Sequence, residues 1–308
     1  MKKVAWITDD IYLQHDTGAG HPESAERLKS INLKITTLKD KLMEVSPRLA
    51  TVEELELIHH LAMIEHVEKK AKVGMSIDAD TILSKHSYMA ARKAVGAGLV
   101  AVDGVKSKRF ERAFCAVRPP GHHATPTKSM GFCLFNNIAI TAKYAQKQGY
   151  SKVMIIDFDV HHGNGTQDAF YADNTVFYFS THEAYSFPGT GKWADTGIDE
   201  GEGFTRNYPI MSEGKDEDIL GFYHTELYEE YAKFKPDIVL VSAGYDLHED
   251  DPLAGLEIST EGIRRIVRAI LDLGDTPVIF MLEGGYDVTD LGWNVVATVE
   301  EMLRGDEV

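Results

Sequence analysis

The fold of this chain is decided by the stretch Val153-Met-Ile-Ile-Asp-Phe-Asp-Val-His-His-Gly-Asn-Gly-Thr-Gln167. Its first four residues are apolar, and a short apolar run before turn residues is typical of a buried parallel strand. Carboxylates, imidazoles and glycines follow the run directly. Because the ligand crevice of an open α/β sheet lies beyond the carboxyl ends of its strands, we expect these polar side chains to line such a crevice.

Asp159 and His161 alternate with Val160, so in an extended segment both side chains point to the same side. A carboxylate oxygen and an imidazole nitrogen that converge on one point suit a divalent metal such as zinc. The alternative is a strand end whose polar groups are satisfied by the protein alone. The stretch by itself favours the metal site.

Length and composition limit the class of protein. A chain of 308 residues with 44% hydrophobic residues can bury a large core, and one α/β domain of this size is ordinary. The net charge of -16 argues against direct nucleic-acid binding, which needs a basic face. The acidity also suits a cationic substrate, although a solvated acidic surface explains it better.

The two cysteines, Cys115 and Cys133, form no CxxC motif and indicate no disulfide framework. We therefore expect a reduced, cytoplasmic setting. The apolar run at residues 4–7 is too short for a signal peptide, and no run approaches a membrane span. The sequence predicts a soluble chain without a membrane partner; it says nothing of the oligomeric state.

Hydrophobic patterns of strand and helix type alternate along the whole chain. Strands are expected at residues 4–7, 112–117, 152–156, 175–180, 237–242 and 277–282. Helices are expected at residues 22–38, 51–59, 63–73, 87–105, 136–148, 216–234, 259–273 and 288–303, with a long loop at 181–203. This alternation predicts a single domain over residues 1–308, a three-layer αβα fold with a mostly parallel central sheet.

Four of the predicted strands end in residues that can carry chemistry. In chain order, these residues are His122 and His123; Asp157, Asp159 and His161; Asp246; and Tyr286. A parallel sheet places such ends on one rim. Asp159, His161 and Asp246 would then make a three-ligand zinc site with an open position, which is typical of catalytic rather than structural zinc. Such a site activates water and polarises a carbonyl, the chemistry of amide hydrolysis.

The reaction also needs a base and a hydrogen-bond donor for the developing oxyanion. His122 and His123 are the candidates for base and acid, and Asp157 and Asn164 could orient them. Tyr286 could reach the crevice. The alternatives are a structural turn for the paired histidines and an ordinary half-buried position for the tyrosine.

Aromatic residues stand in two loops near the same rim. Phe132 follows Gly131, and Phe187 precedes a Pro-Gly pair. Two facing rings would form a narrow apolar slot for an alkyl chain. From the spacing alone, ordinary loop packing explains them better.

Six motifs together resemble the histone deacetylase family, the zinc-dependent group of the arginase/deacetylase fold. They are Arg118-Pro-Pro-Gly-His-His-Ala124, Gly131-Phe-Cys-Leu-Phe-Asn-Asn137, the segment 157–167, Phe187-Pro-Gly-Thr-Gly191, Ala243-Gly-Tyr-Asp246 and Leu282-Glu-Gly-Gly-Tyr286. The segment His21-Pro-Glu23 and Arg27 are similar to the N-terminal motif of the family. Asn164 stands where class I members carry Asp, so the chain looks most like class II and its prokaryotic relatives.

The resemblance implies a role for each matching position. Asp159, His161 and Asp246 correspond to the ligands of zinc, with ferrous iron as an alternative metal. Among the catalytic positions, His123 corresponds to the general base and acid, His122 to its tandem partner and Tyr286 to the oxyanion donor. The substrate channel corresponds to Gly131, Phe132, Phe187 and Leu253. The family also binds potassium, here at positions Asp157, Asp159, His161, Ser180 and Thr181, partly through backbone oxygens.

The predicted function is therefore a zinc-dependent amidohydrolase that removes acetyl or related acyl groups from lysine-like amines by metal-activated water. The partner would be an acetylated lysine side chain or an acetylated amine or polyamine. An acetylpolyamine amidohydrolase is the alternative within the class, although Leu253 stands where polyamine-selective members carry an acidic residue. His162 has no role in this scheme beyond a structural one.

Two alternatives belong to other classes of protein. An arginase-like ureohydrolase uses two manganese ions and extra aspartates, whereas Leu247 and His248 follow Asp246 here. A non-catalytic acyl-lysine binding module is the other alternative, but every catalytic position is filled.

Overall fold

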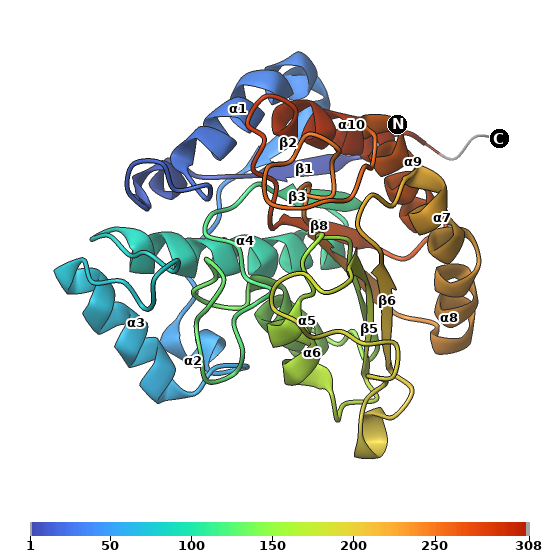
Figure 1. The fold of residues 1–308 in the computed structure, drawn as a ribbon, viewed down its shortest axis with the longest axis horizontal. Coiled ribbons are helices and arrows are strands. Elements are labelled where there is room, and N and C mark those ends of the chain that lie inside the picture. Colours follow the sequence, from blue (N-terminus) through green and yellow to red (C-terminus); the bar gives the residue numbers. More distant parts are fainter. Residues whose placement is uncertain (1, 306–308) are drawn as a thin grey trace.

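Eight strands form one parallel sheet at the centre of the molecule (Figure 1). The computed structural model describes residues 2–305, and there the strands lie in the order β2-β1-β3-β8-β7-β4-β5-β6, every pair parallel. In chain order they are β1 (Val4–Ile7), β2 (Leu42–Val45), β3 (Arg112–Cys115), β4 (Val153–Asp157), β5 (Val176–Glu183), β6 (Thr205–Ile210), β7 (Ile238–Ala243) and β8 (Val278–Leu282).

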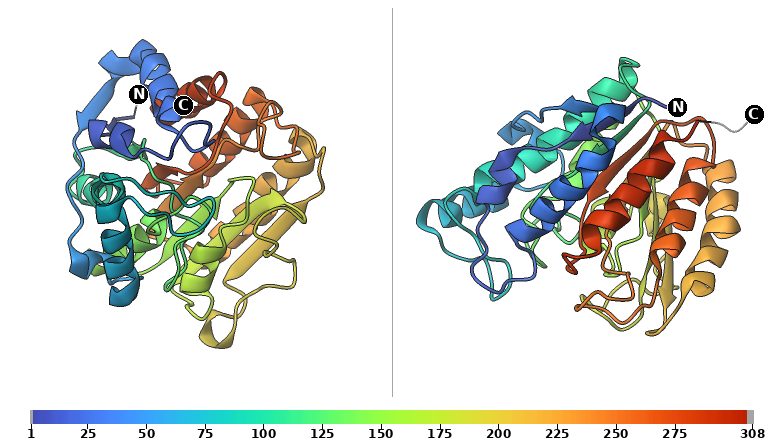
Figure 2. Two further views of the ribbon diagram at one scale, coloured as in Figure 1. Left: turned by 60° about the vertical axis from the view of Figure 1, so that its left-hand side comes forward. Right: turned by 90° about the horizontal axis from the view of Figure 1, so that it is seen from above.

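Helices cover both faces of the sheet (Figure 2). On one side α1 packs against α10, α10 against α9, and α9 against α7, which α8 follows. On the other side α5 packs between α4 and α6, and α3 lies outside α4 with α2 beside it. The bounds are α1 (Ala25–Ile35), α2 (Val52–Leu55), α3 (Leu61–Val73), α4 (Ser87–Lys106), α5 (Asn137–Lys147), α6 (Asn164–Phe170), α7 (Asp216–His224), α8 (Glu226–Phe234), α9 (Thr260–Leu271) and α10 (Leu291–Leu303). The predicted three-layer fold is confirmed.

The central strands are covered on both faces, which explains their composition. Every residue of β4, β7 and β8 is buried. A strand buried on both faces needs a continuous apolar run rather than an alternating pattern, and residues 153–156 and 278–282 have such runs. These strands were therefore the easiest to predict. Among residues 2–305, no helix has the length and apolar character that crossing a bilayer requires.

The edges of the sheet differ from the prediction. β2 and β6 were not expected; both are edge strands, and only Val45 of β2 is buried. β6 contains Pro209, which an edge strand tolerates because one side of it needs no ladder hydrogen bonds. β5 continues to Glu183 and pairs with β6 there, so residues 181–183 are strand and not the start of a loop.

Several helix bounds also differ. The first helix begins at Ala25, three residues after Pro22, and α2 ends after one turn although its predicted Thr51–Glu54 capping box is present. The helix expected at 216–234 breaks at Thr225, whose hydroxyl donates to the carbonyl of Gly221 at 2.7 Å. α6, which begins at Asn164 within the 153–167 stretch and continues to Phe170, was not expected, and α10 begins at 291 rather than 288.

The four strands with polar ends are neighbours in the middle of the sheet. They lie in the order β3-β8-β7-β4. β3 and β4 are consecutive strands in the chain, but β8 and β7 lie between them in the sheet. Because all four run parallel, their carboxyl ends open on the same edge. The common rim that the sequence predicted is confirmed.

Candidate functional site

Three possible metal ligands meet at this rim. Nδ1 of His161 lies 3.3 Å from Oδ1 of Asp159 and 3.0 Å from Oδ2 of Asp246. The ligand atoms of the three residues all lie within 4.8 Å of one another, and both aspartates are buried. They come from the segment after β4 and from the end of β7, which are adjacent strands.

Backbone groups hold the two carboxylates in place. Asp159 accepts from the N–H of Gly284 at 2.8 Å, and Asp246 accepts from the N–H of Val160 at 3.0 Å. Position 284 needs a glycine, since a Cβ there would lie 2.1 Å from Oδ2 of Asp246 and 2.6 Å from Oδ2 of Asp159. The Gly-Gly pair after β8 thus lets the backbone approach both carboxylates.

The electrostatics of this trio suit a bound cation. Burial raises the pKa of Asp246, and the negative charge of Asp159 raises it further. Burial lowers the pKa of His161, but hydrogen bonds and charge from the two aspartates outweigh it and raise that pKa to about 11. Two carboxylates and one imidazole are a donor set that zinc or ferrous iron accepts. The residues present therefore fit a divalent metal.

The tandem histidines lie beside the trio and have different partners. Nδ1 of His122 lies 3.1 Å from Oδ2 of Asp157, and Nδ1 of His123 lies 2.9 Å from Oδ1 of Asn164. The sequence indicated Asp157 and Asn164 as partners of the two histidines, without assigning either to a particular ring. The two rings are 4.0 Å apart between centroids, and Nε2 of His122 lies 3.8 Å from Oδ1 of Asp159.

The different surroundings of the two rings move their pKa values in opposite directions. Burial lowers the pKa of His122, but the charges of Asp159 and Asp157 outweigh it and raise that pKa to about 10. Burial and the neighbouring His122 hold the pKa of His123 well below its ordinary value. His123 therefore stays neutral, and donation from its Nδ1 to the amide oxygen of Asn164 leaves Nε2 as the basic nitrogen.

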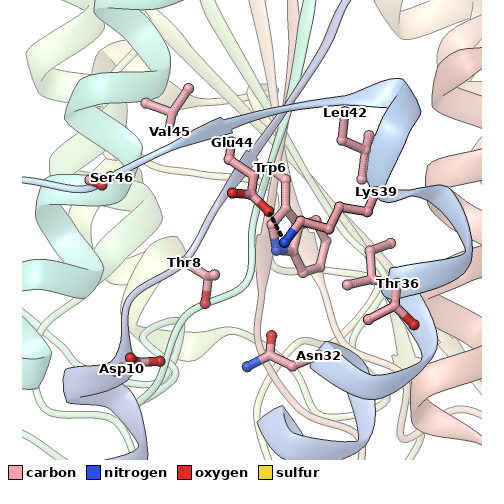
Figure 3. A pocket seen from close by; sticks show the side chains of 11 residues that line it. Trp6, Thr8, Asp10, Asn32, Thr36, Lys39, Leu42, Glu44, Val45 and Ser46 are labelled. Carbon is pink, nitrogen blue, oxygen red and sulfur yellow. Dashed lines mark ion pairs between the residues drawn. The ribbon is translucent and has the colours of Figure 1, made fainter.

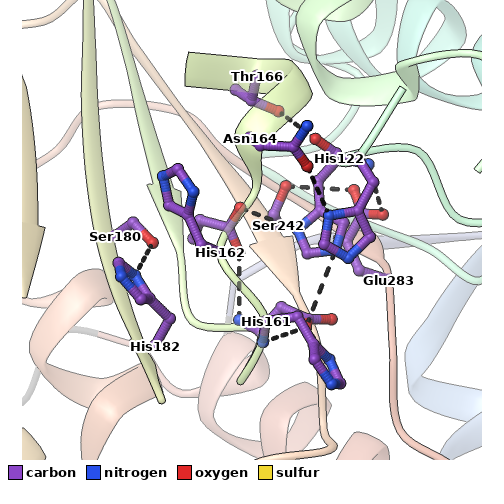
Figure 4. A network of polar contacts seen from close by, with 12 residues as sticks. His122, His161, His162, Asn164, Thr166, Ser180, His182, Ser242 and Glu283 are labelled. Atoms are coloured by element: carbon purple, nitrogen blue, oxygen red, sulfur yellow. Dashed lines mark hydrogen bonds and ion pairs between the residues drawn. The ribbon is translucent and has the colours of Figure 1, made fainter. Parts of the chain in front are cut away.

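Glu283 is a buried member of the site to which the sequence assigned no role. Its carboxylate accepts from the N–H groups of Gly121 and His122 at 2.6 and 3.1 Å, and from the hydroxyl of Ser242 at 3.2 Å (Figure 4). Burial raises its pKa to about 7. Glu283 thus fixes the histidine loop from the end of the neighbouring strand β8. Its place directly after an apolar strand was the available signal, but the pairing of β3 with β8 was not known.

Tyr286 is partly exposed and keeps its hydroxyl available. Its ring packs edge-on against Phe132 at 5.8 Å between centroids, and the Arg27 guanidinium lies 4.9 Å from the ring centroid. The hydroxyl makes no hydrogen bond to any of residues 2–305. Its backbone N–H donates to Oδ2 of Asp251 at 2.6 Å.

The N-terminal motif forms a buried ion network under the tyrosine loop. Glu23 pairs with Arg27 at 3.1 Å and with Arg118 at 2.5 Å, and all three side chains are fully buried. Arg27 also donates to the carbonyls of Glu283 and Gly285, each at 2.6 Å. The first helix and the histidine loop are thereby joined to the loop that carries Tyr286.

Three of the predicted channel residues, Gly131, Phe132 and Phe187, lie against His123 or Tyr286. Phe187 is 43% exposed and packs edge-on against His123 at 5.0 Å between centroids, whereas Phe132 packs against Tyr286. Among residues 2–305 no ring contact joins Phe132 to Phe187. Gly131 has φ +55°, and a Cβ there would lie 2.7 Å from the His123 ring, so this position also favours glycine. The side chain of Leu253 is 39% exposed.

The residues predicted to bind potassium lie next to this cluster. Ser180 is the register partner of Asp157 on the neighbouring strand and is buried, as is Thr181. Both hydroxyls have protein partners, His182 at 2.9 Å and the Tyr223 hydroxyl at 2.8 Å. Only their remaining lone pairs and the backbone oxygens are left for a cation.

His162 points away from the trio and is held by protein groups on both nitrogens. Its Nδ1 lies 2.7 Å from the Thr190 hydroxyl, and its Nε2 lies 3.1 Å from Oε1 of Gln167. Burial and the adjacent His182 lower its pKa well below the ordinary value. These contacts agree with the structural role expected for it.

One cleft adjoins the candidate site and another lies apart from it. The first, of about 670 Å³, is lined by Tyr286 and by the loop that includes His15 and His21. The second, of about 540 Å³, opens beside β1 and β2, where the ion pair of Lys39 with Glu44 spans 3.2 Å (Figure 3). None of the predicted site residues lines the second cleft.

Comparison with known proteins shows what this arrangement is similar to. The sequence model of the histone deacetylase domain family matches residues 21–302 of this chain. "Histone deacetylase 10, chloroplastic" of Oryza sativa subsp. japonica is 38% identical, over 92% of this chain and 70% of its own length. A "Probable deacetylase" of Archaeoglobus fulgidus is 34% identical, over 90% of this chain and 79% of its own length. The crystal structure of the HDA15 HD domain superposes with a TM-score of 0.94 at 34% identity, covering 98% of this chain and 88% of that one.

Proposed function

Because this chain belongs to the histone deacetylase family, we propose that it is a zinc-dependent deacetylase of lysine-like amines. Family membership supports deacetylation in general. One juxtaposition carries the more specific proposal. Two carboxylates and an imidazole meet beside a neutral histidine and a tyrosine with an available hydroxyl.

Asp159, His161 and Asp246 would hold the metal ion. Zinc in such a site supplies Lewis acidity, which polarises the amide carbonyl and makes water a better nucleophile near neutral pH. Ferrous iron fits the same donors. We further propose a potassium ion beside Asp157 and Ser180, whose positions on adjacent strands match those of the family.

His123 would serve as the general base and then as the general acid. Its Nδ1–H is fixed by Asn164, so Nε2 can take a proton from the attacking water and return it to the departing amine. His122, paired with Asp157, would carry a positive charge beside the reacting atoms. Because their pKa values move in opposite directions, the two neighbouring imidazoles can take different roles, one as a neutral base and the other as a positive charge.

Tyr286 would stabilise the negative charge that develops on the carbonyl oxygen. Among residues 2–305 its hydroxyl has no hydrogen-bond partner that it would have to give up. A donor that is fixed before the reaction costs no reorganisation when the charge forms. Phe132 packs against its ring and limits the directions in which the hydroxyl can point.

The substrate proposed is the acetylated lysine side chain, with an acetylated polyamine as the second candidate. Phe187, Gly131 and Leu253 would border the substrate channel, and an aromatic ring and an aliphatic side chain there would suit an extended alkyl chain. Leu253 offers no charge to a second ammonium group, and this favours lysine over polyamine.

The test is hydrolysis of an acetyl-lysine peptide and of N-acetylspermidine by the zinc-loaded chain, followed by mass spectrometry. We expect release of acetate from the peptide, with one metal ion per chain. Tyr286→Phe is expected to lower kcat by roughly 10²–10³-fold, as loss of one oxyanion donor does. Tyr185→Phe is the matched control, because Tyr185 is 94% exposed.

Two results would overturn the proposal. An inactive wild-type chain with either metal would exclude hydrolysis of these amides. Two metal ions per chain would favour the ureohydrolase alternative instead.

A further inference from the structure

The Asp251 carboxylate lies between two loops of the candidate site and is bonded to both. Oδ2 accepts from the N–H of Tyr286 at 2.6 Å and from the N–H of Asp287 at 3.3 Å. Oδ1 accepts from the N–H of Leu253 at 3.0 Å. The residue is only 7% exposed, so these bonds are shielded from water. Three backbone N–H groups thus converge on one shielded carboxylate.

The loop before Tyr286 does not fix its own conformation. Gly284 and Gly285 precede the tyrosine, and Gly285 has φ +115°, a value that glycine adopts freely. Two successive glycines leave the backbone with many accessible states. Arg27 holds the carbonyl oxygens of Glu283 and Gly285, and both backbone groups of Gly284 are bonded, its N–H to Asp159 and its C=O to the N–H of Tyr245. At the tyrosine itself, within residues 2–305, the backbone N–H has Asp251 as its one acceptor.

The position of the Tyr286 hydroxyl follows from that backbone. Among residues 2–305 the hydroxyl has no hydrogen-bond partner. Phe132 contacts the ring edge-on, and Arg27 lies over its face. Neither contact prevents the ring from moving along its long axis. A displacement of about 1 Å at a reacting group can cost roughly 10²-fold in rate.

We infer that Asp251 is a positioning residue that places the Tyr286 hydroxyl for oxyanion stabilisation. The inference rests on the proposed function of Tyr286. The same carboxylate also fixes the backbone of the predicted channel residue Leu253, because its other oxygen accepts from the N–H of that residue. One buried side chain therefore fixes the distance between the acyl-chain entrance and the oxyanion donor.

The first test compares three substitutions on the acetyl-lysine peptide. Asp251→Ala removes all three bonds and is expected to lower kcat about 100-fold, with a KM change of less than about threefold. Asp251→Asn keeps one oxygen for the N–H groups of Tyr286 and Asp287, so it is expected to recover most of that loss. Asp250→Ala makes the same change of charge at a neighbouring exposed side chain and is expected to leave both constants unchanged.

A double-mutant cycle shows whether Asp251 acts through the tyrosine. In the Tyr286→Phe background, Asp251→Ala is expected to lower kcat by no more than about twofold, because the hydroxyl that it positions is gone. Two losses that multiply would overturn the inference. So would a kcat of Asp251→Ala equal to that of the wild type.

Amide hydrogen exchange gives a readout that needs no activity. The peptide that contains Tyr286 and Asp287 is expected to exchange at least about tenfold faster in Asp251→Ala and close to the wild-type rate in Asp250→Ala. An unchanged rate would overturn the inference even if the wild-type chain proved inactive. Inactivity with faster exchange would instead overturn the proposed function alone. If Asp251→Ala does not fold, Asp251→Leu, which removes the same acceptors at a similar side-chain volume, takes its place in both measurements.

Discussion

Replacing Gly284 with alanine should disrupt the proposed metal site while leaving its ligands chemically intact. The added Cβ would lie 2.1 Å from Oδ2 of Asp246 and 2.6 Å from Oδ2 of Asp159. Carbon and oxygen atoms in contact need about 3.3 Å, so the Asp246 carboxylate must move by about 1 Å. Ligand distances in a metal site hold within roughly 0.2 Å. A shift of this size removes at least one ligand from its place.

The expected result is a loss of zinc affinity of at least about 100-fold, or about 2.8 kcal/mol. The assay is competition for zinc between the folded protein and a chromophoric chelator, with deacetylation of the acetyl-lysine peptide measured in parallel. Overpacking also costs about 1–3 kcal/mol of folding free energy. Thermal unfolding of the metal-free protein therefore accompanies each affinity measurement.

Gly221→Ala is the control. Gly221 lies inside α7, and a Cβ there meets nothing within 4 Å. The change should stabilise the protein by about 0.4–1 kcal/mol and leave zinc affinity unchanged. Wild-type zinc affinity in a folded Gly284→Ala protein would refute the assignment of Asp159 and Asp246 as ligands.

Three further predictions concern stability. Burial lowers the pKa of His59 from 6.5 to about 4, so between these pH values the unfolded chain binds a proton that the folded chain does not. The neutral His59 should therefore contribute about 3 kcal/mol to the free energy of unfolding above pH 6.5, and this contribution should be lost as the pH falls toward 4. An equal pH dependence of stability in His59→Gln would contradict this. Glu23→Gln leaves Arg27 and Arg118 buried without a counter-charge, so urea unfolding should show a loss of about 3–5 kcal/mol. Thr51→Ala removes the side-chain cap of α2 and should cost about 1 kcal/mol by the same assay.

The elements that the sequence predicted well are those whose signal is local. The buried strands are continuous apolar runs, and α5 and α9 begin after Asn136 and Ser259, whose side chains cap them. The edge strands β2 and β6 lacked such a signal, since burial on one side requires no apolar run. The break at Thr225 was missed because the residues on both sides favour a helix, and only the local backbone geometry shows that it ends.

The candidate site divides in the same way. In a parallel sheet every strand ends on the same edge, so residues after four strands could be placed on one rim without knowing the strand order. Partners across strands do depend on that order. Glu283 supports the backbone of His122 only because β8 lies next to β3, although 160 residues separate them. Asp251 reaches Tyr286 only because the loops after β7 and β8 are adjacent.

This dependence on strand order has a consequence for how the site is assembled. The histidine loop follows β3 and two proposed ligands follow β4, yet β8 and β7 lie between those strands. Glu283, which holds the backbone of the histidine loop, and Gly284, which donates to Asp159, both come from the end of β8. The catalytic geometry can therefore form only when the C-terminal strands have inserted into the middle of the sheet. Cooperative packing of the sheet centre, rather than any local segment, is what fixes the positions of the reacting groups.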